Sequence, residues 1–148
     1  MLRLVEKALS DRGITSVVYT GDLTRAKRDR AIREFQQTDG GPQVFLASYG
    51  AGSTGLTLTA ANVVYLLDPW WNPFTEDQAI DRVHRIGQTR PVRIYKVTMA
   101  ESIEQGVVAC QTSKRKASEG ILGSSAGRPT ASVGVSVGEL SALLSSRR

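Results

Sequence analysis

Apolar residues along this chain form short continuous runs that alternate with stretches in which they recur every three or four positions. The short runs are rich in β-branched and aromatic residues, as buried strands are, and they cover residues 14–19, 43–47, 63–67 and 92–97. The periodic stretches predict helices that begin near residues 2, 24, 73 and 101. Strands that alternate with helices are typical of a parallel sheet with helices on both faces. The pattern therefore predicts an α/β fold with a mainly parallel sheet flanked by helices.

The helix expected from Pro73 to Gly87 carries the most informative polar positions. Proline suits the first turn of a helix, and glycine commonly follows its last turn. Gln78, Arg82 and Arg85 are spaced so that they fall on one face of such a helix. The apolar positions fall on the opposite face, at Ala79, Ile80, Val83 and Ile86.

This polar stripe has two interpretations. Two guanidinium groups held side by side on a rigid helix suit the binding of phosphate. A solvated face explains the same residues equally well, because Asp77 and Asp81 are placed to pair with arginines along the helix. The spacing alone leaves both interpretations open.

The end of the chain differs in composition from the rest. From about Gly120 the sequence turns to glycine, serine and alanine, and no periodic apolar face returns until Leu140. Such a composition is typical of a flexible linker. We therefore predict one domain over residues 1–122, a linker over 123–137, and a short terminal helix or tail over 138–148.

Composition excludes several classes of protein. The 148 residues carry a formal net charge of +5, mostly from arginine, which makes a polyanionic partner plausible. A single cysteine, Cys110, permits neither an internal disulfide nor a cysteine-based zinc site, and with one histidine no metal centre is expected. His84 is instead expected to be a structural residue. No apolar run approaches a membrane span, and residues 1–20 lack a secretory pattern. The sequence thus predicts a soluble protein of a reducing compartment, without a membrane partner.

Both tryptophans of the chain lie in one turn, in the sequence Asp68-Pro-Trp-Trp-Asn-Pro73 that follows a predicted strand. Open α/β sheets bind ligands at the carboxyl ends of their strands, and an exposed indole can wedge into or stack on nucleic acid. Alternatively, both indoles fill the gap between sheet and helix. We expect one of each, with Trp70 buried and Trp71 reaching outward.

Two further loops have polar or glycine-rich sequences after predicted strands. The backbone amides of residues 48–59, SYGAGSTGLTLT, could hold phosphate, but no Walker A lysine follows, and a tight connection is the commoner reason for such glycines. Thr20-Gly21, which precedes a helix studded with arginines, could bind a nucleic-acid backbone. Judged on charge alone, a solvated helix face is the favoured interpretation there.

Three segments resemble the helicase motifs of Swi/Snf-type ATPases, the DNA translocases of superfamily two. QAIDRVHRIGQTRPV resembles their sixth motif, and LASYGAGSTGLTLTAANVVYLLDPWWNP resembles the fifth motif and the segment after it. TGDLTRAKRDRAIREF is similar to the pattern between the fourth and fifth motifs. The likeness spans residues 1–122. The Trp-Trp-Asn-Pro sequence and a closing GELSALL look most like the branch that includes helicase-like transcription factor and yeast post-replication-repair translocases.

The resemblance implies a RecA-like second lobe of three layers. In this family ATP lies between two lobes, and the first supplies the phosphate loop and the Asp-Glu pair that holds magnesium, so ATP and Mg²⁺ would be held mainly by a first lobe. The second lobe supplies arginine fingers from the sixth motif. The resemblance assigns catalytic roles to Arg85, as the finger, and to Arg82, as its partner on the γ-phosphate. It assigns nucleotide binding to Gln78, Gly52 and Gly55.

Contacts to DNA follow from the same likeness. Ser48 and Trp71 match positions that touch the DNA backbone or minor groove in relatives, and Gly21 lies in the Thr-Gly turn considered above. The partners implied are double-stranded DNA, chromatin and a first RecA-like lobe. The implied location is the nucleus, with roles in chromatin remodelling or DNA repair.

The sequence also departs from the family. Ser53 and Thr57 stand where the fifth motif usually has glycine and asparagine, and no Walker A sequence, Asp-Glu-x-His box or Phe-Ser-Gln start of the fourth motif is present. We therefore expect the second lobe of an ATP-dependent DNA translocase that hydrolyses ATP negligibly on its own. The alternative is a non-enzymatic DNA- or protein-binding module derived from such a lobe.

Overall fold

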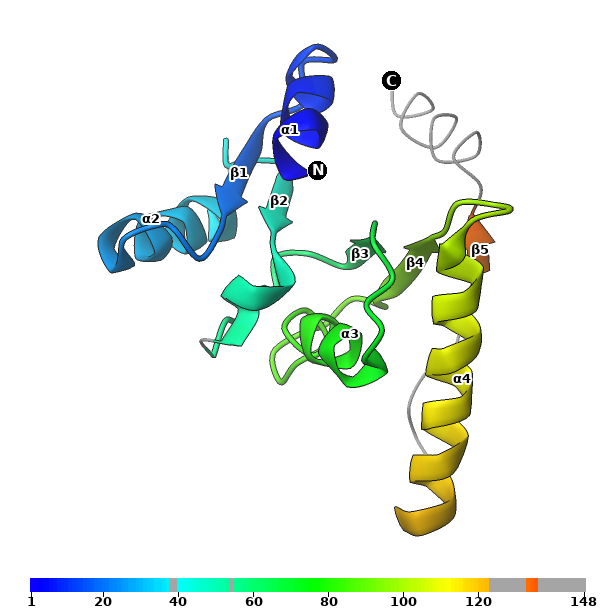
Figure 1. Cartoon of the computed structure of the whole chain (residues 1–148). Coiled ribbons are helices and arrows are strands. Elements are labelled where there is room, and N and C mark those ends of the chain that lie inside the picture. The colour runs from blue at the N-terminus through cyan, green and yellow to red at the C-terminus, as the bar shows by residue number, and fades with distance from the viewer. Residues whose placement is uncertain (38–39, 54, 123–132, 136–148) are drawn as a thin grey trace. The chain divides into compact units, whose positions relative to one another are not determined.

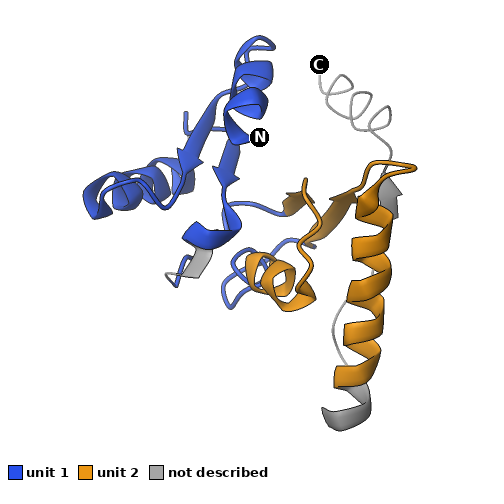
Figure 2. Ribbon diagram, in the orientation of Figure 1, with its two compact units in different colours: residues 1–62, 81–91 blue, residues 63–80, 92–148 orange. Residues whose placement is uncertain are grey.

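The computed structural model describes residues 1–37, 40–53, 55–122 and 133–135 of the chain (Figure 1). These residues divide into two compact units, which are considered one at a time (Figure 2). Unit 1 contains residues 1–62 and 81–91, and unit 2 contains residues 63–80 and 92–148. The chain thus leaves unit 1 after residue 62, enters unit 2, and returns to unit 1 for eleven residues that follow position 80.

Unit 1 is built on two parallel strands. Its elements are α1 (Leu2–Ser10), β1 (Ser16–Tyr19), α2 (Arg25–Gln36), β2 (Val44–Ala47) and the 3₁₀ helix η1 (Tyr49–Ser53). Ser16 pairs with Val44 and Tyr19 with Ala47, so the two strands end at the same edge of the sheet. Helix α1 contacts both strands and α2 contacts β1.

The core of unit 1 is aromatic. Tyr19 is almost fully buried, together with Ala31 of α2. The ring of Phe45 lies 5.5 Å from that of Tyr19 and 5.1 Å from that of Phe35, measured between centroids. Tilted aromatic pairs at this spacing add to the free energy of burying their area. Leu56 of the glycine-rich loop is buried in the same cluster, which anchors the loop at the end of the sheet.

Unit 2 carries a sheet of three strands. Its elements are β3 (Val63–Leu66), α3 (Pro73–Ile80), β4 (Arg93–Val97), α4 (Ile103–Leu122) and β5 (Val133–Val135). The strand order is β3-β4-β5, and both pairs are parallel. Helices α3 and α4 contact each other. Every strand pair in the described residues is therefore parallel, which confirms the predicted α/β class with a mainly parallel sheet.

The helix predicted from Pro73 to Gly87 is shorter than expected. Helix α3 ends at Ile80, and the residues that follow form turns. In a continued helix the carbonyl of Arg82 would accept the amide of residue 86, but it accepts the Leu58 N–H at 2.8 Å instead. The predicted apolar face is also wrong at Ile86, which is 99% exposed. A tertiary hydrogen bond thus replaces the helical one.

Within the predicted linker over 123–137, β5 (Val133–Val135) pairs with β4, and the other residues of that range lie outside the described residues. The pairing is made by backbone groups, which glycine- and serine-rich sequence offers as well as any other. The helix or tail predicted over 138–148 lies outside the described residues. Among the helices that the structure describes, none is both long and apolar enough to cross a membrane.

Candidate functional site

In unit 1, Arg85 binds the glycine-rich loop. Its Nη1 donates hydrogen bonds to the carbonyl oxygens of Gly55 at 3.2 Å and Leu56 at 3.0 Å, and to Thr57 Oγ1 at 3.1 Å. All three bonds start from a single nitrogen of the guanidinium group. Hydrogen bonds from a charged donor are stronger than neutral ones. Arg85 therefore ties the segment after α3 to a loop about thirty residues earlier in the chain.

Arg82 lies beside the same loop. Its carbonyl oxygen accepts the Leu58 N–H at 2.8 Å, which fixes its backbone against the loop. Its side chain is half-buried, and the Nε atom is buried without a hydrogen-bond partner in the described part of the chain. A buried N–H without an acceptor costs free energy, so such groups are rare. This donor is suited to an oxygen of an anionic ligand.

Two residues that the sequence interpretation missed strengthen this junction. Gln88 Nε2 donates to the carbonyl oxygens of Ala61 at 2.5 Å and Thr59 at 3.2 Å, and its Oε1 accepts the Arg90 N–H at 3.0 Å. The Arg90 guanidinium also donates to the carbonyl oxygen of Ala60. The only signal in the sequence was that these polar residues directly follow Gly87, where a helix was expected to stop.

Gly52 and Gly55 are the glycines predicted to shape the loop. Gly55 has φ of +22°, a conformation that side chains with a Cβ rarely adopt, although an added Cβ there would meet no atom within 4 Å. Backbone conformation rather than crowding is therefore what favours glycine at this position. Gly52 lies within η1.

The structure gathers only part of the predicted polar stripe. Arg85 and Gly55 are in contact, and Arg82 lies next to both on the same unit. Gln78 is exposed on α3 in unit 2, so the three stripe residues do not share one helix. The expectation that Gln78, Arg82 and Arg85 form a single helical face is therefore wrong, because α3 ends before the arginines.

Two of the three predicted DNA-binding residues lie at one edge of unit 1. Gly21 follows β1 and Ser48 follows β2, whose ends are paired in register. The Ser48 N–H donates to the carbonyl oxygen of Tyr19 at 3.2 Å, which joins the two strand ends. The Gly21 carbonyl oxygen accepts Arg28 Nη2 at 2.5 Å, so this arginine is used within the protein. The carboxyl ends of parallel strands are the usual place for ligands in α/β folds.

The outer face of α2 is basic and solvated. Arg30 pairs with Glu34 at 2.7 Å, four residues further along the helix. This hydrogen bond, together with the negative charge of Glu34, raises the pKa of Arg30 above its usual value. The exposed pair agrees with the solvated interpretation of this helix.

In unit 2, both tryptophans are exposed at the turn between β3 and α3. Trp71 is 65% exposed, as expected, and Lys114 Nζ lies 4.4 Å from the centroid of its ring. Trp70 is 45% exposed, so the expectation that it is buried is wrong. The Trp70 N–H donates to Glu76 Oε1 at 3.0 Å. Because the turn is held through its backbone, the indole of Trp70 does not need to be packed in the core.

Glu76 is the polar residue that the sequence interpretation missed most clearly. Its side chain is 0% exposed, and its Oε1 accepts Gln111 Nε2 at 2.6 Å. Its Oε2 forms an ion pair with the Lys96 ammonium. An acid in the first turn of a helix is normally a surface partner of the helix dipole, so nothing in the sequence marked this one as buried.

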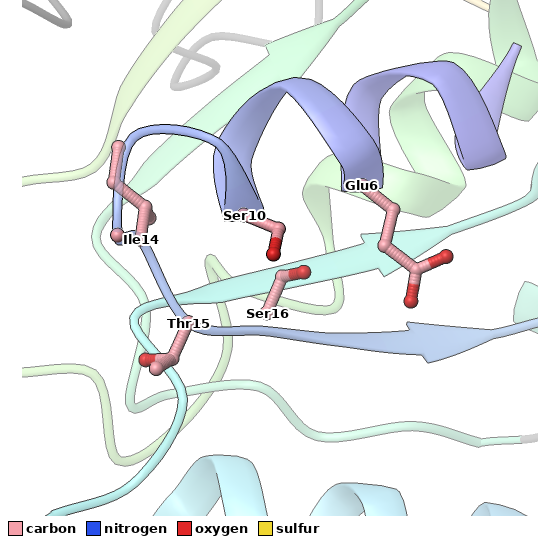
Figure 3. A pocket seen from close by; sticks show the side chains of 6 residues that line it. Glu6, Ser10, Ile14, Thr15 and Ser16 are labelled. Atoms are coloured by element: carbon pink, nitrogen blue, oxygen red, sulfur yellow. The ribbon is translucent and has the colours of Figure 1, made fainter.

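A pocket in unit 1 lies apart from the predicted residues. It has a volume of about 340 Å³ and lies between α1 and the start of β1 (Figure 3). Its lining consists of Glu6, Ser10, Gly13, Ile14, Thr15 and Ser16. The lining has one carboxylate and no basic side chain, so it is unsuited to a phosphate ligand.

Comparison with known proteins identifies relatives that share most of this chain. Residues 1–87 match the helicase conserved C-terminal domain. Helicase-like transcription factor CHR28 of Arabidopsis thaliana is 47% identical over 116 residues, which are 78% of this chain and 12% of that protein. Helicase-like transcription factor of Homo sapiens is 40% identical over 123 residues, 82% of this chain and 12% of that protein. DNA repair protein RAD5 of Cryptococcus neoformans is 41% identical over 113 residues, 76% of this chain and 9% of that protein.

A solved structure has the same fold. The crystal structure of the C-terminal part of the Fun30 ATPase domain superimposes with a TM-score of 0.70 and 32% identity, over 74% of this chain and 35% of that one. The chain thus spans a small part of the length of its curated relatives, between 9% and 12% for the three named above.

Removing the Arg85 side chain should loosen the glycine-rich loop. In Arg85→Ala the loop loses three hydrogen bonds, and we expect amides of residues 55–60 to exchange with solvent roughly tenfold faster, the change that about one net charged hydrogen bond produces. Hydrogen exchange followed by mass spectrometry of peptides that cover the loop measures this. The matched control is Arg25→Ala on the exposed face of α2. Equal exchange in both variants would contradict the conclusion that Arg85 holds the loop.

Proposed function

The chain belongs to the family of the helicase conserved C-terminal domain, and we propose that it acts as the second RecA-like lobe of an ATP-dependent, Swi/Snf-type DNA translocase. The family match agrees with the resemblance drawn from the fifth-motif and sixth-motif residues. In this role residues 1–122 form the lobe, which supplies arginines to a nucleotide and contacts to duplex DNA. The activity and partners of the whole protein are part of the proposal.

The observation that supports the proposal most directly is the junction of two arginines with the glycine-rich loop in unit 1. Arg85 is fixed by bonds from Nη1 to the loop, and Arg82 has a buried Nε–H that makes no hydrogen bond in the described part of the chain. Two guanidinium groups beside a backbone turn suit the oxygens of a phosphate chain. We assign the catalytic role to Arg85 and Arg82, and nucleotide contacts to Gly52, Gly55 and Gln78.

The chemistry proposed for this lobe is electrostatic. ATP, held with Mg²⁺ mainly by a first lobe, supplies the phosphoryl group that is transferred. An arginine aimed at that group stabilises the negative charge that develops on it, which is worth on the order of a thousandfold or more in rate. The loop carbonyls that bind Arg85 would hold its guanidinium in a fixed direction, and preorganised donors of this kind are the effective ones.

DNA contacts are proposed on both units. Gly21 and Ser48 lie together at the paired ends of β1 and β2, where backbone amides and a hydroxyl suit DNA phosphates. Trp71, exposed beside Lys114, would wedge into or stack on the duplex. The names of the relatives, helicase-like transcription factor and DNA repair protein, are consistent with a DNA partner. From the motif resemblance we also propose that the DNA is duplex, that chromatin is a partner and that the protein acts in the nucleus.

One observation favours a second function, a non-enzymatic module that binds DNA or a partner protein. Thr57, which departs from the family asparagine, accepts a hydrogen bond from Arg85 at 3.1 Å. In that case Arg85 is a structural tie only. Salt-dependent binding of duplex DNA that nucleotide does not change would favour this second function.

Alone, the purified chain should not hydrolyse ATP. With ATP, Mg²⁺ and duplex DNA, we expect phosphate release no faster than from Arg85→Ala, because the sequence contains no phosphate loop and no acidic magnesium box. A coupled phosphate assay measures this. Turnover by the unmodified chain above that of Arg85→Ala would refute the expectation.

Duplex DNA should bind through Trp71. In Trp71→Ala we expect the dissociation constant for a short duplex to rise about tenfold, since loss of one base–aromatic contact costs about 1–3 kcal/mol, and binding should weaken steeply with salt. Fluorescence polarisation of labelled DNA measures both. Ile103→Ala, also exposed in unit 2, is the control. Equal affinity of the two variants and the unmodified chain would exclude Trp71 from the interface.

A further inference from the structure

Side chains from α3 and α4 reach the backbone of the tryptophan turn, defined here as residues 68–72. The Trp70 N–H donates to Glu76 Oε1 of α3 at 3.0 Å, and Gln111 Nε2 of α4 donates to the carbonyl oxygen of Trp70. Lys114 Nζ of α4 donates to the carbonyl oxygen of Trp71 at 3.1 Å. Three polar groups of the backbone, the Trp70 N–H, the Trp70 carbonyl and the Trp71 carbonyl, are therefore bound by side chains.

The buried part of this arrangement has little freedom to rearrange. Glu76 and Gln111 are both buried, and Lys96 of β4 pairs with the Glu76 carboxylate while it donates to Gln111 Oε1 at 3.2 Å. Because the amide oxygen of Gln111 is used by Lys96, its amide nitrogen must face the turn and Glu76. A buried carboxylate that lost these partners would be strongly destabilising.

The exposed part of the arrangement acts on the Trp71 ring itself. Lys114 Nζ lies 4.4 Å from the ring centroid, well within the range of a cation–π contact. Gln111 and Lys114 are three positions apart on α4, so they project from the same face of the helix. One position further, Arg115 binds both carboxylate oxygens of Asp77, at 2.8 Å and 3.1 Å, and thereby joins α4 to α3 beside the turn.

We propose that these side chains form a clamp that sets the direction of the Trp71 indole. The clamp consists of Glu76, Lys96, Gln111 and Lys114. The buried residues fix the backbone of the turn, and Lys114 covers one face of the ring while Trp71 as a residue stays 65% exposed. Lys114 is thus a positioning residue for Trp71, and its consequence for DNA rests on the proposed function.

Tryptophan fluorescence reports on this turn directly. The chain has two tryptophans, both in the turn, and in a Trp70→Phe background Trp71 is the sole tryptophan, which excitation at the red edge of the absorption band selects over the four tyrosines. Phenylalanine keeps the backbone N–H and carbonyl that the clamp binds. In that background, without DNA, we expect Lys114→Met to raise the acrylamide quenching constant about twofold, as loss of an exposed cation–π contact implies, and to lower the fluorescence anisotropy. Acrylamide is neutral, so the lost charge does not itself change the quencher concentration.

Two variants make the test specific. Lys114→Arg should restore quenching and anisotropy, because arginine also donates hydrogen bonds and covers aromatic rings. Lys116→Met removes the same charge from an exposed position of α4 and should leave both values unchanged. Unchanged quenching in Lys114→Met, or an equal change in Lys116→Met, would refute the proposal that Lys114 positions the Trp71 indole.

A measurement of DNA affinity distinguishes failure of the clamp from failure of the proposed function. If the clamp and the function both hold, Lys114→Met weakens duplex binding more than Lys116→Met does. If Lys114→Met changes the fluorescence but neither it nor Trp71→Ala changes DNA affinity, the clamp stands and the proposed role of Trp71 falls.

Discussion

The hydrogen bonds from Arg85 to the glycine-rich loop are the interaction on which the arrangement of unit 1 depends. They hold the segment after α3 against a loop that begins at the end of β2, and the Arg82 backbone follows through its bond to Leu58. Gln88 and Arg90 continue the same junction toward Ala60 and Ala61. A loop without regular secondary structure must satisfy its backbone carbonyls somehow, and here guanidinium and amide side chains do so. The same contacts fix where the arginines lie.

In unit 2 a polar side chain also binds the backbone of a loop, and there the side chain is a buried carboxylate. Glu76 is enclosed by Lys96 and Gln111, and through them the tryptophan turn is joined to β4 and α4. A carboxylate without solvent is tolerated only when it is paired and hydrogen-bonded. In both units, then, a polar side chain from a distant part of the chain holds a loop that carries a proposed contact, with nucleotide in unit 1 and with DNA in unit 2.

The local pattern of apolar residues predicted most of the helices and strands. It did not predict where those elements end or how the buried polar side chains bind one another. Alternation of apolar runs predicted the parallel strands, and Pro73 marked the start of α3 correctly. The end of α3 was not predictable, because it depends on a bond between Arg82 and Leu58, residues that are distant in sequence. Likewise, Trp70 is exposed because the turn is held by its backbone, and Glu76 resembles any acid in a first helical turn. Motif likeness supplied the family and the candidate arginines, whose roles geometry alone does not assign.

We propose that Arg82 and Arg85 act on a nucleotide that another lobe holds. The direct measurement is ATP hydrolysis on duplex DNA by this chain mixed with a separate first lobe that carries the phosphate loop and magnesium site. We predict hydrolysis by the mixture, and a fall on the order of a thousandfold in both Arg82→Ala and Arg85→Ala, with Arg25→Ala as active as the unmodified chain. Undiminished hydrolysis in both arginine variants would contradict it.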